Sequence, residues 1–293
     1  MKQILFRGAA TALVTPMQPD GSLDLETLSR LTEWQIQSSI SALVPCGTTG
    51  EAATLTDEER FTVIQTVAKT AAGRVPVIAG AGCNDTARAE QNCLAAAAAG
   101  ADALLLVTPY YNKCTPKGLQ SHFARLASAT PLPVILYNVP SRTGVTIDME
   151  SRRKLSKVDN IIGLKEASTD FSLIHQHLLE LGDTLPLYSG NDDLTLPLMS
   201  LGAHGCISVL SNLLPHSTEA LCQAILQNDL PAARSLHYSL LPLMKSLFCA
   251  VKAAMPLVGF PCGSCRMPLS LIEPDHLALL QQQFTMMKQL GLC

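Results

Sequence analysis

The sequence predicts an α/β protein, a (β/α)8 TIM barrel with a C-terminal helical extension. Short segments rich in Val, Ile, Leu and Ala recur eight times between residues 8 and 209, with helical patterns between them. The eight units fit into about 220 residues, close to the ~250 residues typical of such barrels. A doubly wound open sheet is the alternative, but no Gly-x-Gly-x-x-Gly motif follows the first segment.

The eight expected strands are continuous apolar runs. Such runs are typical of parallel strands that are buried on both faces. The expected strands cover residues 8–16, 41–45, 75–80, 101–107, 133–137, 161–165, 185–190 and 205–209. Parallel neighbours need crossover connections, and the helical patterns between the strands supply them.

Helix start and stop signals separate the strands. Thr56 and Glu59 have the spacing of a capping box, and Gly73 marks the end of the helix that follows. Further helices are expected over residues 87–99, from Pro116 behind Thr115, and over residues 172–181. The chain after the eighth strand is mainly helical. We therefore expect a barrel with the active site over residues 1–214 and a C-terminal helical region over residues 215–293.

Composition excludes several classes of partner. The chain of 293 residues is 47% hydrophobic and 15% charged, with a net charge of −3, which argues against a nucleic-acid or membrane surface as main partner. No apolar run reaches membrane-spanning length. The first residues lead straight into a strand-like segment and lack the long apolar stretch of a secretory signal. We therefore expect a cytoplasmic protein.

Cysteine and histidine spacing gives little support for a metal site. Ten cysteines are spread along the chain, and in a reducing compartment we expect most of them to be small buried hydrophobes. Cys262 and Cys265 have Cys-x-x-Cys spacing, but no second pair accompanies them. His175 and His177 form the only close histidine pair, within an expected helix, where we predict a solvated face. No metal is expected.

Lys165 is the leading catalytic candidate. It stands at the end of the sixth expected strand, after the apolar run that starts at Ile161. Its amine would lie in a dry pocket, and burial favours the neutral, nucleophilic form of an amine. Such a lysine can form a Schiff base with a carbonyl substrate. The alternative is a strand-end lysine that points at solvent.

Polar motifs follow other strands of the predicted barrel, where chemistry collects in this fold. The turn Gly47–Glu51 follows the second strand, and its amides can hold a carboxylate, although a plain connector is the alternative. Thr108–Lys113 follows the fourth strand and Tyr137–Gly144 the fifth. Three of the five tyrosines fall in these two segments. Phenols can carry protons, and Arg142 offers a planar fork for a carboxylate.

Taken together, these motifs resemble the dihydrodipicolinate synthase family of the pyruvate-dependent class I aldolase superfamily. The motifs that carry the resemblance are residues 47–51, 109–112, 137–144 and 163–167. The resemblance extends from about Leu5 to Asn212, with weaker similarity to the C-terminus.

The resemblance implies roles for the candidate residues. Lys165 would attack pyruvate and form the Schiff base, while Thr48 and Thr49 would hold the pyruvate carboxylate. Tyr137 would move protons, in a relay with Thr49 and Tyr111. In the family the tyrosine at the position of Tyr111 comes from a neighbouring subunit.

The resemblance also implies the second substrate and the assembly. Arg142 would bind the carboxylate of L-aspartate 4-semialdehyde, and Gly190 and Ile207 would line the pocket. The product would be 4-hydroxy-tetrahydrodipicolinate, in the first committed step of diaminopimelate and lysine biosynthesis. No cofactor is expected beyond the covalent pyruvate Schiff base on Lys165. We expect a homotetramer, a dimer of dimers, and at least a homodimer.

Two alternative functions compete with the synthase. The sialic-acid lyase branch of the superfamily shares the lysine and the strand-five tyrosine, but it usually has Ser-Thr in place of Thr48 and Thr49 and lacks the arginine at Arg142. These two features favour the synthase. A non-enzymatic pyruvate-binding homologue is the other alternative, and the intact lysine, tyrosine and threonine set argues against it.

The chain departs from the family pattern at two places. The segment Leu247–Lys252 is several residues shorter than in most synthases, which puts the entrance geometry and the assembly in question. Arg88 stands where lysine-inhibited members carry an acid, while Asn84 fits the regulatory pattern. The regulatory histidines are also absent, with Asp57 and Arg60 in their region. We predict weak or no feedback by lysine.

Overall fold

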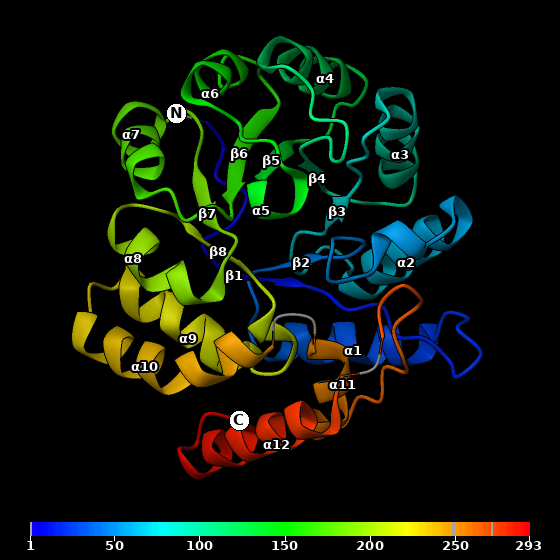
Figure 1. The fold of residues 1–293 in the computed structure, drawn as a ribbon, viewed down its shortest axis with the longest axis vertical. Helices are drawn as coiled ribbons and strands as arrows, with labels where there is room; N and C mark the ends of the chain where they lie inside the picture. The colour runs from blue at the N-terminus through cyan, green and yellow to red at the C-terminus, as the bar shows by residue number, and fades with distance from the viewer. Residues whose placement is uncertain (1, 248–249, 271) are drawn as a thin grey trace.

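Eight parallel strands form a barrel at the centre of the molecule (Figure 1). The structure is a computed structural model that describes residues 2–247, 250–270 and 272–293. The strands are β1 (Gly8–Ala12), β2 (Ala42–Val44), β3 (Ile78–Gly80), β4 (Ala103–Val107), β5 (Val134–Asn138), β6 (Ile161–Glu166), β7 (Leu187–Ser189) and β8 (Gly205–Ser208). Each strand overlaps the segment expected from the sequence, so the barrel prediction is confirmed.

The sheet closes between β2 and β3. The eight strands pair in the order β2-β1-β8-β7-β6-β5-β4-β3, which leaves one edge of β2 and one edge of β3. A parallel bridge between Leu43 and Val77 joins the two remaining edges. The Leu43 amide donates to Pro76 O at 2.9 Å, and the Gly80 amide donates to Pro45 O at 2.9 Å. Since all strands run in one direction, their C-terminal ends meet at one mouth, where this fold places its active sites.

Side chains from the strands fill the interior of the barrel. The inner cluster comprises Phe6, Ala10, Ala12, Ala42, Val44, Ile78, Ala103, Leu105, Ile135, Tyr137, Val139, Ile162, Ala167, Tyr188 and Ile207. Phe6 stacks on Tyr188 with ring centroids 4.4 Å apart, and the Tyr188 hydroxyl donates to Phe6 O at 3.1 Å. Because Phe6 precedes β1, this contact fills the barrel toward the N-terminal ends of the strands.

A ring of helices surrounds the barrel (Figure 1). The helices are α1 (Leu25–Gln37), α2 (Asp57–Ala71), α3 (Thr86–Ala98), α4 (Pro116–Ser128), α5 (Pro140–Thr143), α6 (Met149–Leu155), α7 (Phe171–Leu181), α8 (Thr195–Ser200), α9 (Pro215–Leu226), α10 (Leu230–Ser246), α11 (Val251–Ala254) and α12 (Pro274–Gln289). The predicted capping box is present, because Thr56 Oγ1 accepts from the Glu59 amide at 3.2 Å and Glu59 Oε2 accepts from the Thr56 amide at 3.0 Å. The helix then ends at Ala71, and Ala72 takes the left-handed cap position one residue before Gly73.

The C-terminal helices lie against one side of the barrel. The Glu219 carboxylate of α9 accepts a hydrogen bond from the Ala9 amide of β1 at 2.7 Å. Helix α9 therefore covers the barrel in the place of an eighth outer helix, while α10 and α12 pack on each other beyond it. A division of the chain at residue 215 stays a proposal.

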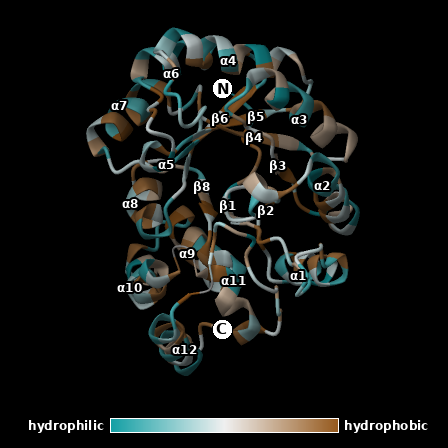
Figure 2. Ribbon diagram, turned by 45° about the vertical axis from the view of Figure 1, so that its right-hand side comes forward, coloured by the Kyte–Doolittle hydropathy of each residue, from teal (hydrophilic) through white to brown (hydrophobic). Residues whose placement is uncertain are grey.

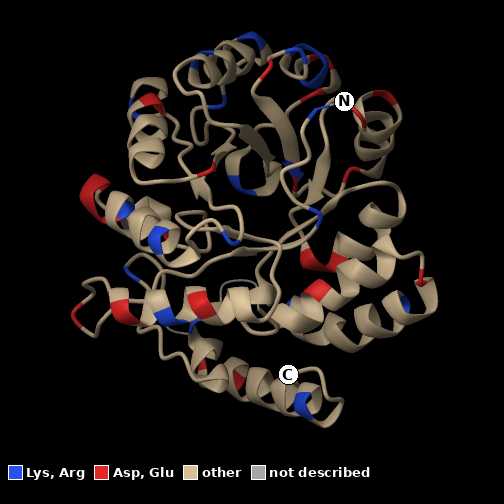
Figure 3. Cartoon of the chain, turned by 180° about the vertical axis from the view of Figure 1, so that it is seen from behind, with Lys and Arg blue, Asp and Glu red and all other residues tan. Residues whose placement is uncertain are grey.

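The outer surface is polar and carries both signs of charge. Hydrophobic residues colour the strands and the barrel-facing sides of the helices, and hydrophilic residues colour much of the outside (Figure 2). Basic and acidic residues both occur on the outer helices on the side that Figure 3 shows. Among the described residues no single helix is long and apolar enough to cross a membrane; α10 with residues 251–258 reaches that length only as a pair bent by 112°.

Candidate active site

Lys165 points into the barrel. Its register partners are Tyr137 of β5 and Tyr188 of β7. Side chains at the same level of neighbouring strands point to the same face of a sheet, and both tyrosines belong to the inner cluster. Lys165 is 6% exposed, and its Nζ lies 4.2 Å from the centroid of the Tyr137 ring. The alternative of a lysine that points at solvent is therefore wrong.

Gly190, just after β7, leaves room for the stem of Lys165. A Cβ atom at this position would lie 2.8 Å from Ala167 Cβ and 3.1 Å from Lys165 Cε. The Gly190 amide donates to Glu166 O at 2.7 Å, which holds the two chain segments together. Ile207 of β8 is buried in the inner cluster that also contains the Tyr137 ring. The structure thus brings Gly190 against the lysine and places Ile207 in the same barrel interior.

A cavity opens beyond the lysine, at the ends of three strands. Its volume is about 350 Å³, within the range of small-molecule sites. The cavity is lined by Pro140, Ser141, Ala167, Ser168, Thr169, Asp170 and Asn191. Ala167 follows Lys165 by two residues and belongs to the inner cluster, so the cavity lies beside the lysine at the mouth of the barrel.

The turn after β2 is folded by its own backbone. The Gly50 amide donates to Gly47 O at 3.1 Å, and the Glu51 amide donates to Thr48 O at 3.1 Å. Thr15 Oγ1 donates to Gly50 O at 2.7 Å and ties the turn to the chain after β1. Thr48 is exposed and Thr49 is half-buried, so both are accessible at the mouth. The turn therefore presents hydroxyl and amide donors in a fixed conformation.

Two predicted residues lie at the surface of the single chain. Tyr111, after β4, is 88% exposed and has a left-handed φ of 79°. An aromatic ring so exposed is not buried against the lysine of its own chain. Arg142 lies on α5, directly after β5, and its side chain is also exposed. Burial raises the pKa of the neighbouring Tyr110 phenol, which interacts with Cys83.

A buried ion pair that the sequence analysis did not name lies behind the lysine. Arg152 of α6 and Glu166, the residue after Lys165, contact each other at 2.5 Å, and both side chains are fully buried. Glu166 Oε1 accepts from Asn138 Nδ2 at 2.8 Å and from the Ser168 amide at 2.8 Å. Burial lowers the pKa of Arg152, and the Glu166 charge opposes that shift. This network fixes the ends of β5 and β6.

Asp192 is a second acidic group that the sequence analysis missed. One carboxylate oxygen, Oδ2, accepts from the Val209 and Leu210 amides at 3.1 and 2.9 Å. The other, Oδ1, is buried without a hydrogen-bond partner among the described residues. Burial raises the pKa of Asp192, and the charge of Lys165 lowers it. The signal in the sequence was an acid two residues after the strand-end glycine Gly190.

The histidine pair of α7 is not a metal site. His177 is buried, which corrects the predicted solvated face, while His175 is exposed on the same helix. His177 Nε2 donates to Leu185 O at 2.9 Å, and burial together with the Arg152 charge lowers the pKa of His177 to about 4. The described part of the chain contains no cluster of three or more His, Cys, Asp or Glu side chains that could hold a metal ion.

Most of the described cysteines are buried, as predicted. Six of them are buried. Burial raises the pKa of the Cys46 thiol, beside the turn after β2, to about 12. Burial also raises the pKa of Cys262 to about 12, so neither thiol is poised to react as a thiolate at neutral pH.

A (β/α)8 barrel that buries a lysine amine at the C-terminal ends of its strands has the arrangement that Schiff-base chemistry requires. The model of the dihydrodipicolinate synthetase family matches residues 5–287, and the chain belongs to this family. The family prediction made from the motifs is confirmed.

Individual relatives match along nearly the whole chain. A 4-hydroxy-tetrahydrodipicolinate synthase of Exiguobacterium sibiricum is 47% identical over 283 residues, which cover 94% of this chain and 97% of the relative. A chloride-inhibited dihydrodipicolinate synthase of Acinetobacter baumannii, solved in complex with pyruvate, has a TM-score of 0.92 and 38% identity, with 98% and 99% of the two chains covered. A monomeric dihydrodipicolinate synthase variant has a TM-score of 0.93 and 37% identity, with 99% and 98% covered.

Proposed function

We propose that this chain condenses pyruvate with L-aspartate 4-semialdehyde to form 4-hydroxy-tetrahydrodipicolinate, the first committed step of diaminopimelate and lysine biosynthesis. The family membership and the name that the relatives share support this reaction. The observation that carries the chemistry is the buried Lys165 amine, 4.2 Å from the Tyr137 ring centroid. Lys165 is only 6% exposed, and the cavity of about 350 Å³ at the end of its strand is large enough for both small acids.

Lys165 is the nucleophile in the proposed reaction. Its neutral amine attacks the ketone carbon of pyruvate, and loss of water gives a protonated Schiff base. The Schiff base withdraws electrons, so the pyruvate methyl group loses a proton and an enamine forms. The enamine carbon attacks the aldehyde of the second substrate. The amine of the product then displaces Lys165 during ring closure and frees the enzyme.

Tyr137 and the threonines serve this sequence of steps. The Tyr137 ring packs against the amine, so its phenol is at hand to carry the protons of carbinolamine and enamine formation. The hydroxyls and amides of Thr48 and Thr49 hold the pyruvate carboxylate. Thr49 connects to Tyr137 in a proton relay that Tyr111 extends.

The exposure of Tyr111 supports a shared active site. At 88% exposure, its ring is available to reach into the mouth of a neighbouring barrel. We propose that the active unit is at least a homodimer and that two dimers form a homotetramer. The monomeric relative indicates that family membership alone does not decide the assembly. The short segment Leu247–Lys252 includes Phe248 and Cys249, which lie outside the described residues.

Arg142 selects the second substrate. It is held on the short helix α5 above the strand that carries Tyr137, and its guanidinium pairs with the carboxylate of the semialdehyde. Gly190 and Ile207 shape the pocket. The reaction needs no cofactor other than the pyruvate adduct on Lys165, and we place the enzyme in the cytoplasm.

Weak or absent feedback by lysine stays a prediction. Arg88, at the start of α3, contacts Asp57 of α2 at 3.2 Å on the surface. This guanidinium puts a positive charge where an inhibitor ammonium would need an acid, so the charge should repel lysine.

Steady-state condensation assays test the proposal. Pyruvate is offered with L-aspartate 4-semialdehyde, with N-acetylmannosamine and with simple aldehydes, and adducts are trapped with borohydride and located by mass spectrometry. We expect turnover of pyruvate with the semialdehyde and with none of the other aldehydes, and an adduct on Lys165. Lys165→Ala should abolish both.

Arg142→Ala serves as the matched control. It should still trap pyruvate at the wild-type rate but lose the use of the semialdehyde. A trapped adduct without semialdehyde turnover in the wild type would keep the Schiff base and refute the assigned acceptor. Turnover in Lys165→Ala would refute the mechanism.

A further inference from the structure

A second buried ion pair joins the C-terminal region to the turn after β2. Lys252 Nζ of α11 lies 2.7 Å from Glu51 Oε1, and the two side chains are only 5% and 3% exposed. The two residues are 201 positions apart in the sequence. Glu51 is the last residue of the turn that carries Thr48 and Thr49. The pair therefore connects a distant segment to the turn that the proposed function assigns to the pyruvate carboxylate.

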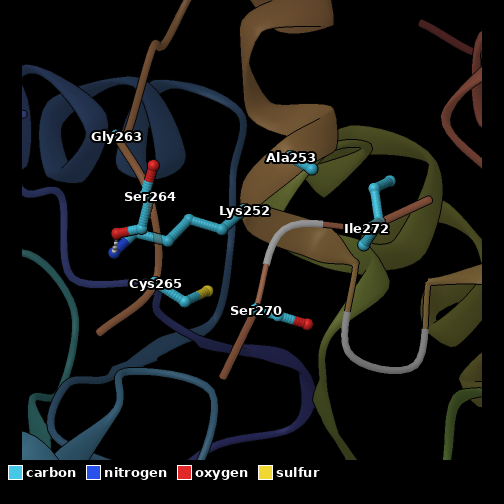
Figure 4. Close-up of a pocket in the computed structure, with 7 residues that line it drawn as sticks. All are labelled: Lys252, Ala253, Gly263, Ser264, Cys265, Ser270 and Ile272. Carbon is cyan, nitrogen blue, oxygen red and sulfur yellow. Dashed lines mark hydrogen bonds between the residues drawn. The ribbon is translucent and has the colours of Figure 1, made fainter. Parts of the chain in front are cut away.

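The charges of this pair are fully engaged by neighbouring backbone. Lys252 Nζ also donates to Ser264 O at 3.0 Å, and Glu51 Oε2 accepts from the Arg266 amide at 2.8 Å. Figure 4 shows Lys252 reaching across to Ser264, between Gly263 and Cys265, with the hydrogen bond dashed. The adjoining hollow has a volume of about 30 Å³, room for about one water molecule. Neither charge is left for a ligand, so the arrangement is a brace.

The segment that holds this brace is itself anchored. The Arg266 guanidinium contacts Glu59 of α2 at 2.5 Å and donates to Thr54 O at 2.7 Å. It also donates to Gly21 O through Nε and Nη2, at 3.0 and 2.7 Å. In Figure 1 the orange chain between α11 and α12 crosses the end of α1 toward α2, which agrees with these contacts. Arg266 thus fixes the C-terminal segment to chain that precedes the turn, at Gly21, and to chain that follows it, at Thr54 and Glu59.

The turn needs such a brace because its backbone is strained. Glu51 has a φ of 57°, in the left-handed region that a residue with a Cβ atom adopts at a cost. Its amide donates to Thr48 O, so the conformation of Glu51 and the position of Thr48 are coupled. A strained residue persists where its surroundings over-determine it, and the Glu51 carboxylate is held by both Lys252 and Arg266. Release of the carboxylate would let the turn relax.

We propose that Glu51 and Lys252 are positioning residues, which hold the Thr48 and Thr49 donors in the geometry that receives the pyruvate carboxylate. The inference rests on the proposed function, because it deepens the role assigned to the turn. Neither residue touches substrate. Buried ion pairs often add little stability but fix one arrangement among several. The C-terminal helical region is on this view a part of the first-substrate site.

The test separates binding of pyruvate from the chemistry at Lys165. Lys252→Met, Glu51→Gln and the double variant are assayed for the KM of pyruvate, the KM of the semialdehyde, kcat and the thermal midpoint. A misplaced binding group can lower efficiency by about 10- to 100-fold. We expect the KM of pyruvate to rise by about tenfold, at the lower end of that range. The kcat at saturating pyruvate and the KM of the semialdehyde should change less than about twofold.

Two variants keep the outcome clear. The double variant removes both charges, so it should regain thermal stability lost in the single variants. It should nevertheless keep the raised KM of pyruvate, because the apolar side chain that replaces Lys252 no longer holds the segment to the turn. Leu280→Ala, in the buried face of α12, lowers stability away from the turn and should leave the KM of pyruvate unchanged.

Each outcome decides the inference. A wild-type KM of pyruvate in a folded double variant would overturn it, as would an equal rise in Leu280→Ala. If the single variants do not fold, the double variant alone decides. Wild-type turnover and trapping are measured alongside: their failure would refute the proposed function, whereas their success with an unchanged KM in the variants would refute only the brace.

Discussion

Two buried ion pairs stand on opposite sides of the barrel mouth, and they differ in how the chain brings them together. Arg152 and Glu166 are 14 residues apart and belong to neighbouring units of the barrel. Lys252 and Glu51 are 201 residues apart and join the barrel to the C-terminal region. The first pair adjoins the lysine that carries the proposed chemistry, and the second adjoins the turn that the proposal assigns to the first substrate.

The difference indicates that the two ion pairs have different roles. The amine lies on a strand whose neighbours on both sides hold it, and the Arg152–Glu166 network stiffens the ends of these strands. The turn after β2 lies beyond the last register pair of β1 and β2, Ala12 with Val44, so side chains from other segments add to the hydrogen bonds of its own backbone. Damage to the first pair should therefore appear mainly in stability, and damage to the second also in the KM of pyruvate.

The largest effect on stability is expected for Arg152→Met. The substitution leaves the Glu166 carboxylate fully buried without its counter-charge, with only Asn138 and a backbone amide as partners. Breaking a buried pair in this way lowers the free energy of unfolding by about 3–5 kcal/mol. Urea or guanidinium unfolding at pH 7 measures it.

The double variant Arg152→Met with Glu166→Gln is the matched control. It removes both charges and keeps an acceptor for Asn138, so it should be more stable than the single variant. A loss below about 1 kcal/mol in Arg152→Met would contradict the assigned burial, since that is the scale of exposed pairs.

The Arg152 side of the mouth should also be sensitive to acid through His177. Burial and the Arg152 charge lower the pKa of His177 from 6.5 to about 4. The unfolded chain therefore binds a proton more readily than the native state. The contribution of neutral His177 to the free energy of unfolding is complete above about pH 6.5. It is lost as the pH falls toward 4, and the loss is about 3 kcal/mol.

Unfolding curves at pH 7, 5 and 4 check the acid sensitivity. His177→Gln can still donate to Leu185 O and should flatten the dependence. Some dependence will remain, because burial also lowers the pKa of His122 to about 4. Identical pH profiles for the wild type and His177→Gln would show that His177 does not titrate in this range.

The sequence sufficed for the strands and for the burial of Lys165 at the end of β6. Apolar runs and their end residues report burial and position along one chain segment, and these decide a barrel strand. Lys165 could be named because it stands at the end of such a run, whereas Gly190 was named from the resemblance to the family. Helices α1, α6 and α8 were not predicted individually, and part of the face that packs on the barrel is polar. Thr32 and Gln35 of α1 are buried examples.

Pairs between distant segments could not be predicted. Glu166 and Lys252 are charged residues beside apolar runs, but the partners of their charges, Arg152 and Glu51, lie on other segments that only the folded chain brings near. His177 shows the same limit, because its helix was predicted correctly while its face was not. Its Nε2 donates to Leu185 O, beyond the end of the helix.

The smallest effect is expected for an exposed pair, which isolates burial as the cause of the larger ones. Glu33 and Arg74 contact each other at 2.5 Å, with side chains 37% and 44% exposed. The Arg74 hydrogen bond lowers the pKa of Glu33 to about 2, yet water solvates both charges in the folded and unfolded states. Glu33→Gln should leave the urea midpoint at pH 7 unchanged within error. A fall comparable with that of Arg152→Met would mean that ion pairing itself stabilises this protein, and that the two sides of the mouth differ for some reason other than burial.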